Sequence, residues 1–182
     1  MRKDIKEDLY RYIGSDCNRL IMQLRYFFFT PGFRYIYYLR HAASSKYFKL
    51  FWWFLLRQCM YRTGIQIPYQ TKIGRGFRIV HFGAIVVNPS AIIGDNFNIA
   101  EGALIGNTQG KKQGVPVIGN NVCVNANAIV VGGIHIGNNV LIAPGAFVNF
   151  DVPDNSIVIG NPGKIIQRNS SPTAKFIVYP LP

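Results

Sequence analysis

The residue of this chain best suited to acid–base chemistry is His81. The 182-residue sequence contains three histidines, and imidazole is the side chain that most readily exchanges a proton near neutral pH. His41 lies in a basic, aromatic segment, where a structural or interfacial role is favoured. His135 ends one unit of the repeat described below, at a corner where a solvated histidine is the commoner outcome. His81 follows Ile79 and Val80 at an outward-facing position. The alternative to a catalytic role is that it is an ordinary surface histidine.

Neither a covalent nucleophile nor a metal site accompanies His81 in the sequence. The three cysteines, Cys17, Cys59 and Cys123, are scattered, odd in number and without metal-ligand spacing. They indicate a reducing compartment and argue against a disulfide framework. Cys123 has no histidine near it in the repeat, and the only serine close to His81 is Ser90. Direct transfer assisted by a histidine base therefore fits better than a mechanism through a covalent enzyme intermediate.

An aliphatic residue recurs every six positions between Ile67 and Ile159, and this repeat must position His81. A period of six fits neither a helix nor an alternating strand, and it is typical of a hexapeptide β-helix. Three units close a triangular coil of about eighteen residues, with the aliphatic side chains stacked inside at about 4.8 Å. The recurring residues are Ile67, Ile73, Ile79, Ile85, Val87, Ile93, Ile99, Ile105, Ile118, Val124, Val130, Ile136, Ile142 and Val148.

The corners of such a prism need residues that tolerate tight or positive-φ backbone. Glycine-containing pairs follow several of the aliphatic positions, and we expect them to supply this freedom. The pairs are Gly94-Asp95, Gly119-Asn120, Gly132-Gly133 and Gly137-Asn138.

The repeat also predicts a neighbour for His81. A two-residue slip in the period falls between Ile85 and Val87, so one coil there takes about twenty residues. Position 81 then lies beneath Glu101. A carboxylate one strand spacing from an imidazole can orient the ring and stabilise the imidazolium that forms on proton abstraction.

Charge divides the chain into unequal parts. The net charge is +12, with twelve Lys/Arg against four Asp/Glu in residues 1–62 and eight against four in residues 63–182. A hydrophobic content of 49% is enough for one or two compact units.

We expect three parts in the chain: a basic, aromatic-rich helical segment at 1–62, the β-helix domain at 63–166 and a C-terminal tail at 167–182. The tail is expected either to add a strand at 176–179 or to be partly ordered.

Two alternatives stay open for the helical segment 1–62, in which helices are expected at Asp4–Ile13, Asn18–Phe29, Phe33–His41 and Lys46–Met60. In the first alternative it caps the first coil, and its aromatics form core and a self-association surface. In the second, helices lie in a membrane interface. The headgroup-depth aromatics would be Trp52, Trp53, Tyr35, Tyr37 and Tyr38, and the lipid-facing cations Arg34, Arg40, Lys46 and Lys49.

Other locations and partners are less favoured. The apolar run Leu50–Leu56 is far shorter than the roughly twenty residues that span a bilayer. No apolar signal-peptide core follows Met1, so a cytoplasmic protein is expected, on the inner face of the plasma membrane if the segment 1–62 contacts lipid. No nucleic-acid-binding motif is present, and no nucleic-acid partner is expected. The polar, Gly-rich and basic interruption at 107–116 is a loop of the kind that carries function.

Two stretches resemble the left-handed β-helix acyltransferases, in particular the serine acetyltransferase-like branch. They are Lys72–Gly76 followed by Ile79-Val80-His81, and the closing run Val158–Ile166. The resemblance implies a mainly β fold, a left-handed parallel β-helix with an N-terminal α-helical segment. It makes His81 the general base that deprotonates the acceptor hydroxyl for attack on acetyl-CoA, with no metal. It also places the co-substrate between two prisms of a homotrimer, along Gly106, Thr108, Ala126, Pro144 and Lys164, with Lys164 near the phosphates.

Two departures from the serine acetyltransferases bear on the acceptor. Gln66 stands where the family has an aspartate that pairs with the histidine, so Glu101 is a candidate substitute. Gly114-Val115 stand where the family has an Arg-His pair that holds the amino acid's carboxylate. Short members with a basic aromatic N-terminus resemble O-acetyltransferases of capsular or exopolysaccharide biosynthesis.

The sequence therefore predicts an acetyl-CoA-dependent O-acetyltransferase acting on the hydroxyl of a saccharide or lipid-linked saccharide. The alternatives are a serine O-acetyltransferase of cysteine biosynthesis and a non-enzymatic β-helix scaffold or binding module. A trimer and a dimer of trimers both remain open.

Overall fold

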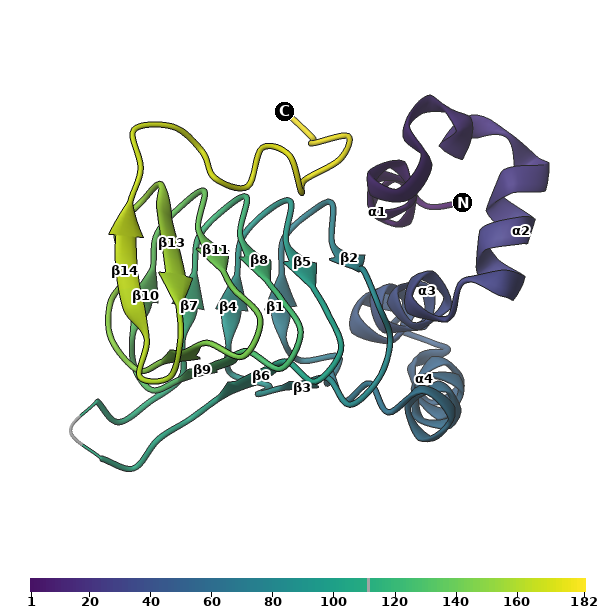
Figure 1. Ribbon diagram of the computed structural model, residues 1–182. Coiled ribbons are helices and arrows are strands. Elements are labelled where there is room, and N and C mark those ends of the chain that lie inside the picture. Colours follow the sequence, from purple (N-terminus) through teal and green to yellow (C-terminus); the bar gives the residue numbers. More distant parts are fainter. Residues whose placement is uncertain (111) are drawn as a thin grey trace.

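Two structural parts make up the chain in the computed structural model, which describes residues 1–110 and 112–182. A group of helices lies against one end of a stack of short strands, and a C-terminal segment runs back along the stack toward the helices (Figure 1). The hydrophobic core is continuous across both parts, because Tyr35 and Leu56 of the helices belong to the same buried cluster as Ile65 of the first coil.

Helices form the N-terminal part, as the sequence predicts. They are α1 (Lys3–Ile13), the 3-10 helix η1 (Gly14–Asn18), α2 (Leu20–Phe29), α3 (Pro31–Ser44) and α4 (Lys49–Thr63). The expected start of the third α-helix at Phe33 is two residues late, because Pro31 needs no N–H partner in a first turn and begins α3. The helix expected from Asn18 begins at Leu20, because Asn18 closes the 3-10 turn. Gly64, with φ 74°, ends α4 in a left-handed cap.

The described residues form fourteen short strands in three sheets, which confirms the predicted parallel β-helix. Sheet I contains β1 (Lys72–Ile73), β4 (Ile92–Ile93), β7 (Val117–Ile118) and β10 (His135–Ile136). Sheet II contains β2 (Arg78–Ile79), β5 (Asn98–Ile99), β8 (Cys123–Val124), β11 (Leu141–Ile142), β13 (Ser156–Ile159) and β14 (Lys164–Gln167). Sheet III contains β3 (Val86–Val87), β6 (Leu104–Gly106), β9 (Ile129–Val131) and β12 (Phe147–Val148). Neighbouring strands are parallel except β13 and β14, which are antiparallel.

Three corners join the sheets in every coil, and each has its own chemistry. The chain passes from sheet I to sheet II at what we term the asparagine corner, represented by residues 94–97 and 119–122. It passes from sheet II to sheet III at the histidine corner, represented by residues 80–85 and 100–103. It returns from sheet III to sheet I at the loop corner, which includes residues 107–116.

The asparagine corner is held by a ladder of asparagine amides. Asn96, Asn121, Asn139 and Asn155 all have a positive φ, between 54° and 56°. Each of the first three donates its side-chain N–H to the amide oxygen of the next, at 3.1, 3.1 and 3.0 Å. Asparagine tolerates this backbone conformation, and its amide is satisfied by the copy in the adjoining coil.

The glycines that precede these asparagines serve a different purpose from the one expected. Gly94 and Gly119 do not have positive φ, so at these corners the left-handed residue is the asparagine two positions later. A Cβ on Gly94 would lie 2.4 Å from the side-chain oxygen of Asn120. Glycine is therefore required here by the close approach of adjacent coils. Gly132, with φ 102°, meets the original expectation.

A buried ion pair attaches the helices to the first coil. Asp8 of α1 is fully buried and accepts hydrogen bonds from the Arg40 guanidinium at 2.8 and 3.0 Å and from the Phe77 N–H at 2.8 Å. Arg40 also donates to the Ile73 carbonyl at 2.7 Å. Burial raises the pKa of Asp8, while the Arg40 charge opposes that rise. The pair fixes α1 and α3 against the asparagine corner of the first coil.

The C-terminal tail forms an extended strap along the prism. Residues 168–182 form no strand, so the added strand considered for 176–179 is wrong; the antiparallel strand is β14, which precedes the tail. The tail is nevertheless hydrogen-bonded along its length: Thr173 donates to the Asn121 carbonyl at 2.9 Å, and the Leu181 N–H donates to the Asn96 side chain at 2.9 Å. Its end reaches α1, where Arg11 donates to the Val178 carbonyl at 3.0 Å (Figure 1).

Across the described part of the chain, no helix combines the length and the apolar character needed to cross a bilayer.

Candidate functional site

The strand register places the corner that contains His81 next to the corner that contains Glu101. Ile79 of β2 pairs with Ile99 of β5, an offset of twenty residues within the strands. A contact between the His81 and Glu101 side chains stays a prediction. In sheet III the offset returns to eighteen, because Val86 pairs with Leu104. The two extra residues therefore belong to the histidine corner itself, between Ile79 and Val86.

This finding corrects the position expected for the slip. Ile85 and Val87 are both buried core residues on either side of the start of β3. Ile85 corresponds by the eighteen-residue offset to the fully buried Ala103 of the next coil, so it occupies an ordinary inward position. The irregular segment precedes it, and it includes His81.

The carboxylate of Glu101 has an acceptor atom with no partner among the described residues. Its Oε2 atom is buried and receives no hydrogen bond. Gly83 lies directly against it, since a Cβ on Gly83 would be 3.1 Å from the Glu101 Cβ. A buried, unpaired carboxylate oxygen is costly. The His81 side chain, by contrast, is exposed. The histidine corner thus contains both an accessible imidazole and a carboxylate with unused hydrogen-bonding capacity.

Ala126 and Pro144 continue the same edge above Glu101. The Asn127 N–H donates to the Glu101 carbonyl at 2.9 Å, and the Gly145 N–H donates to the Ala126 carbonyl at 2.9 Å. Positions 101, 126 and 144 therefore form one stack along the histidine corner, and His81 lies at the same corner in the first coil.

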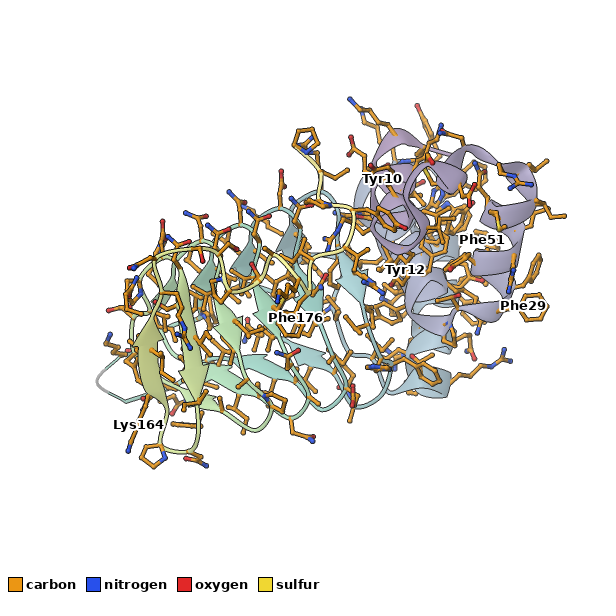
Figure 2. The ribbon with its side chains drawn as sticks, turned by 45° about the horizontal axis from the view of Figure 1, so that its top comes forward. Tyr10, Tyr12, Phe29, Phe51, Lys164 and Phe176 are labelled. Atoms are coloured by element: carbon orange, nitrogen blue, oxygen red, sulfur yellow. The ribbon has the colours of Figure 1, made fainter. Side chains whose placement is uncertain are left out.

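Lys164 lies at the far end of this edge. The turn before it returns to the histidine corner, where the Phe147 N–H donates to the Gly160 carbonyl at 3.0 Å. Lys164 begins β14, and its side chain is exposed, at the end of the prism remote from the helices (Figure 2). Five strand spacings separate β2, which precedes His81, from β14, which is about 24 Å along the prism.

Gly106 and Thr108 lie on the opposite edge of sheet III. Gly106 ends β6, and Thr108 pairs with Gly114 at the base of the long loop. The Thr108 hydroxyl donates to the Lys112 carbonyl at 2.9 Å. Within one protomer, Gly106 and Thr108 therefore lie away from the histidine corner.

The long loop is attached to a later coil, because its partner Asp151 follows β12, two strands beyond β6 in sheet III. Lys112 donates to Asp151 at 2.7 Å, and together with the His135 N–H it holds the pKa of that carboxyl below its usual value. A shallow hollow of about 600 Å³ lies beside the loop. Its lining is polar and includes Asn88, Ser90, Asn107, Thr108, Gln109 and Gln113.

Gln66 borders a second cavity that the sequence did not reveal. Its backbone pairs with Val86 at the start of sheet III, and a cavity of about 240 Å³ adjoins its side chain. Trp53 and Arg57 of α4 and Tyr69 of the first coil also line this cavity. The only sequence signal was the spacing of Trp53 and Arg57, four residues apart on one helix face. The cavity itself arises from packing of α4 on the first coil.

The other histidines lie away from the stack. His41 is half-buried and stacks on Trp52 with ring centroids 4.2 Å apart, and burial lowers its pKa. His135 is exposed on sheet I. Both positions agree with the roles expected for them, and neither side chain is at the histidine corner.

The cysteines are poor nucleophiles in this fold. Cys17, Cys59 and Cys123 are all buried and free. Burial raises the pKa of the Cys123 thiol to about 12, so the reactive thiolate is scarce near neutral pH. Within residues 1–110 and 112–182, no three His, Cys, Asp or Glu side chains cluster as they would around a metal ion.

Comparison with known proteins gives the family. Residues 116–149 match the family described as bacterial transferase hexapeptide (six repeats). A serine acetyltransferase of Helicobacter pylori is 36% identical over 136 residues, which are 73% of this chain and 78% of that protein. The serine acetyltransferase of Synechococcus elongatus is 41% identical over 109 residues, 59% of this chain but only 44% of the longer relative. The chain thus belongs to the hexapeptide-repeat acetyltransferases, in the branch that contains the serine acetyltransferases.

Two further comparisons refine this placement. The putative colanic acid biosynthesis acetyltransferase WcaB of Escherichia coli K12 is 38% identical over 111 residues, covering 61% of this chain and 67% of that protein. The crystal structure of Neisseria gonorrhoeae serine acetyltransferase superposes with a TM-score of 0.77 at 27% identity, covering 96% of this chain and 68% of that one. The fold is that of a left-handed β-helix acyltransferase, as predicted.

Proposed function

We propose that this protein is an acetyl-CoA-dependent O-acetyltransferase that acetylates a sugar hydroxyl, with His81 as general base. The observation that carries the proposal is that exposed His81 and the unpartnered Glu101 carboxylate lie in adjacent coils at the same corner of the prism. His81 takes the proton of the acceptor hydroxyl, and the oxygen attacks the thioester carbonyl carbon. The carbon–sulfur bond breaks, the acetyl group is transferred and the thiolate of CoA leaves, taking up a proton. Glu101 orients the ring and stabilises the imidazolium.

The histidine corner offers a track for the co-substrate. Ala126 and Pro144 present small or rigid side chains between the reacting end at His81 and the cation Lys164, about 24 Å away along the prism. An extended pantetheine arm spans a distance of this order, and an ammonium suits the phosphates at its far end. We therefore assign Ala126, Pro144 and Lys164 to one wall of the acetyl-CoA groove.

The two remaining predicted residues favour a homotrimer. Gly106 and Thr108 lie across sheet III from His81, so one protomer cannot place all five residues around one ligand. A threefold arrangement would bring the loop corner of one protomer against the histidine corner of the next. Each groove would then be completed by Gly106 and Thr108 of a neighbouring copy.

The acceptor side favours a saccharide over free serine. The loop provides Gly114 and Val115 where an Arg-His clamp for a carboxylate would be needed, and their side chains cannot bind an anion in that way. The cavity beside Gln66 is instead lined by the aromatic side chains of Trp53 and Tyr69. Such a lining suits the apolar face of a sugar ring. The similarity to WcaB, named for colanic acid biosynthesis, supports this assignment.

A serine O-acetyltransferase is the second candidate. It is supported by the names of several relatives and by the likeness to a gonococcal serine acetyltransferase solved in complex with serine, at 28% identity and a TM-score of 0.73. If serine is the acceptor, another residue of the assembly must bind its carboxylate in place of the missing Arg-His pair.

The test compares acceptors and then removes the base. CoA release by the purified chain is measured with serine and with an oligosaccharide or lipid-linked glycan. We expect the glycan to give the higher kcat/KM, and faster reaction with serine would establish the second candidate. His81→Ala should lower kcat by about 10²–10⁴-fold. His135→Ala is the matched control and should leave kcat unchanged; equal activity of His81→Ala and wild type would overturn the mechanism.

A further inference from the structure

Helix α2 is apolar but buries none of its side chains. Its sequence from Leu20 to Phe29 contains one cation and no acidic residue. Leu20, Ile21, Phe28 and Phe29 are 69%, 69%, 59% and 81% exposed. Phe29 points outward at the edge of the molecule, away from the prism (Figure 2). A helix of this composition is expected to cover its apolar side chains with another surface.

Helix α4 exposes a second apolar stripe. Leu50, Phe54 and Tyr61 recur at helical spacing and are 76%, 53% and 63% exposed. The segment that leads into the helix adds Tyr47 and Phe48, which are also exposed. α4 therefore presents apolar side chains along its whole length.

Residues of both helices border one hollow, which connects α2 with α4 across α3. The hollow has a volume of about 280 Å³, and it is lined by Phe28 of α2 together with Leu55 of α4. The guanidinium groups of Arg34, from α3, and Arg62, from α4, also line it. A cationic hollow thus lies within an apolar surface. We term this combined surface the apolar-basic face. Its apolar members are Leu20, Ile21, Leu24, Phe28, Phe29, Leu50, Phe51 and Phe54, and its basic members are Arg25, Arg34, Lys49 and Arg62.

The charge of this region is of one sign. No aspartate or glutamate occurs between Asp16 and Asp95, whereas eleven lysines and arginines do. The apolar-basic face therefore has no acidic side chain of its own segment to neutralise it. Its natural complement is a surface that is apolar within and negatively charged outside.

We propose that the apolar-basic face docks the protein on an anionic phospholipid bilayer. The apolar side chains would enter the interface between headgroups and acyl chains, and Arg34 and Arg62 would bind lipid phosphates in the hollow. A second copy of the chain is a poorer complement, because a twofold contact would oppose two cationic faces. This inference is independent of the acetyl transfer proposed above, since it concerns other residues.

Vesicle flotation of the full-length chain tests the docking. We expect flotation with mixed phosphatidylcholine–phosphatidylglycerol vesicles and little with phosphatidylcholine alone. Because each basic residue near an anionic surface contributes about 1 kcal/mol, a factor of about five, Arg25→Gln/Arg62→Gln should weaken partitioning roughly twenty-fivefold. Phe28→Ser/Phe29→Ser/Phe51→Ser should weaken it at least tenfold, because these side chains supply the apolar contact.

Matched controls keep the result interpretable. Phe176→Ser removes a half-exposed aromatic of the tail and should float as wild type does. Circular dichroism and CoA release with a water-soluble acceptor should be unchanged in every variant. Absence of wild-type flotation, or equal flotation of the triple variant, would overturn the proposal. A lower mass of the triple variant in light scattering, without lipid binding by the wild type, would show that the surface joins copies of the chain.

Discussion

The asparagine corner and the histidine corner are built from the same repeat but use it differently. At the asparagine corner, each coil adds one left-handed asparagine and one amide hydrogen bond, so the ladder is regular from Asn96 to Asn155. At the histidine corner, the left-handed position is filled by Gly102, Asn127 and Gly145 in later coils, but the first coil has two extra residues and breaks the series. The irregularity coincides with His81.

The difference separates stability from chemistry. The asparagine corner satisfies its polar side chains internally and is covered by the tail and by α1. The histidine corner leaves the Glu101 Oε2 atom unpaired and His81 exposed. Proteins retain such costly polar groups mainly where a ligand or a reaction uses them. Substitutions at the two corners should therefore change different measured quantities.

The largest effect on stability is expected from Asp8→Ala, next to the asparagine corner. It leaves the Arg40 guanidinium partly buried without its carboxylate, which should lower the free energy of unfolding by about 3–5 kcal/mol. Urea unfolding followed by circular dichroism measures the change. Asp16→Ala, which removes an exposed carboxylate of the same segment, is the control and should have little effect. Equal stability of the two variants would contradict the importance assigned to the buried pair.

A smaller loss of stability is expected from Asn121→Ala. The change removes two rungs of the ladder and places alanine at φ 56°, so we expect a loss of about 2 kcal/mol. Asn121→Gly relieves the backbone strain but not the lost hydrogen bonds, and it should cost about half as much. Exposed Asn149, mutated to alanine, provides the comparison. The kcat of the folded protein should not change in any of the three variants, and a fall in kcat would show that the corners are not independent.

At the histidine corner, Glu101→Gln should change catalysis and leave stability intact. A neutral amide cannot stabilise the imidazolium, so kcat should fall about tenfold, or about 1.4 kcal/mol in the barrier, with KM for acetyl-CoA unchanged. Steady-state kinetics and thermal melting on the same samples measure both quantities. If Gln66 were the partner of His81 instead, Gln66→Ala would lower kcat and Glu101→Gln would not.

The smallest effect is expected at the loop corner. Lys112→Ala breaks an exposed ion pair with Asp151, and such pairs gain little in water. We expect no measurable change in the midpoint of urea unfolding. A clear loss of stability would show that the loop is an integral part of the prism.

Most of the prism could be predicted because its period is local. The aliphatic residues at Ile118, Val124 and Val130 have the same environment in every coil, so spacing alone places them. The sequence did not predict the asparagine ladder. The positive φ at Asn121 depends on how closely the next coil approaches, and the glycine that precedes it is needed for that close approach rather than for a positive φ. The path of the tail could not be derived, because its contacts join residues far apart in the sequence.

The cavity beside Gln66 was also beyond the sequence. It depends on the angle at which α4 meets the first coil, and no spacing rule fixes that angle. The division of the five co-substrate residues between two edges of the prism was beyond the sequence for a related reason. Resemblance to a family identifies residues such as Thr108, but it does not say which protomer contributes each one.

The strap formed by residues 168–182 bears on how the protein unfolds. A solenoid whose coils contact only their neighbours can fray from its open end, one coil at a time. Here the chain leaves that open end and returns to α1 at the opposite one, so the last coil cannot peel away without releasing contacts at the first helix. The prism should therefore unfold as one cooperative unit, because the tail links its two ends.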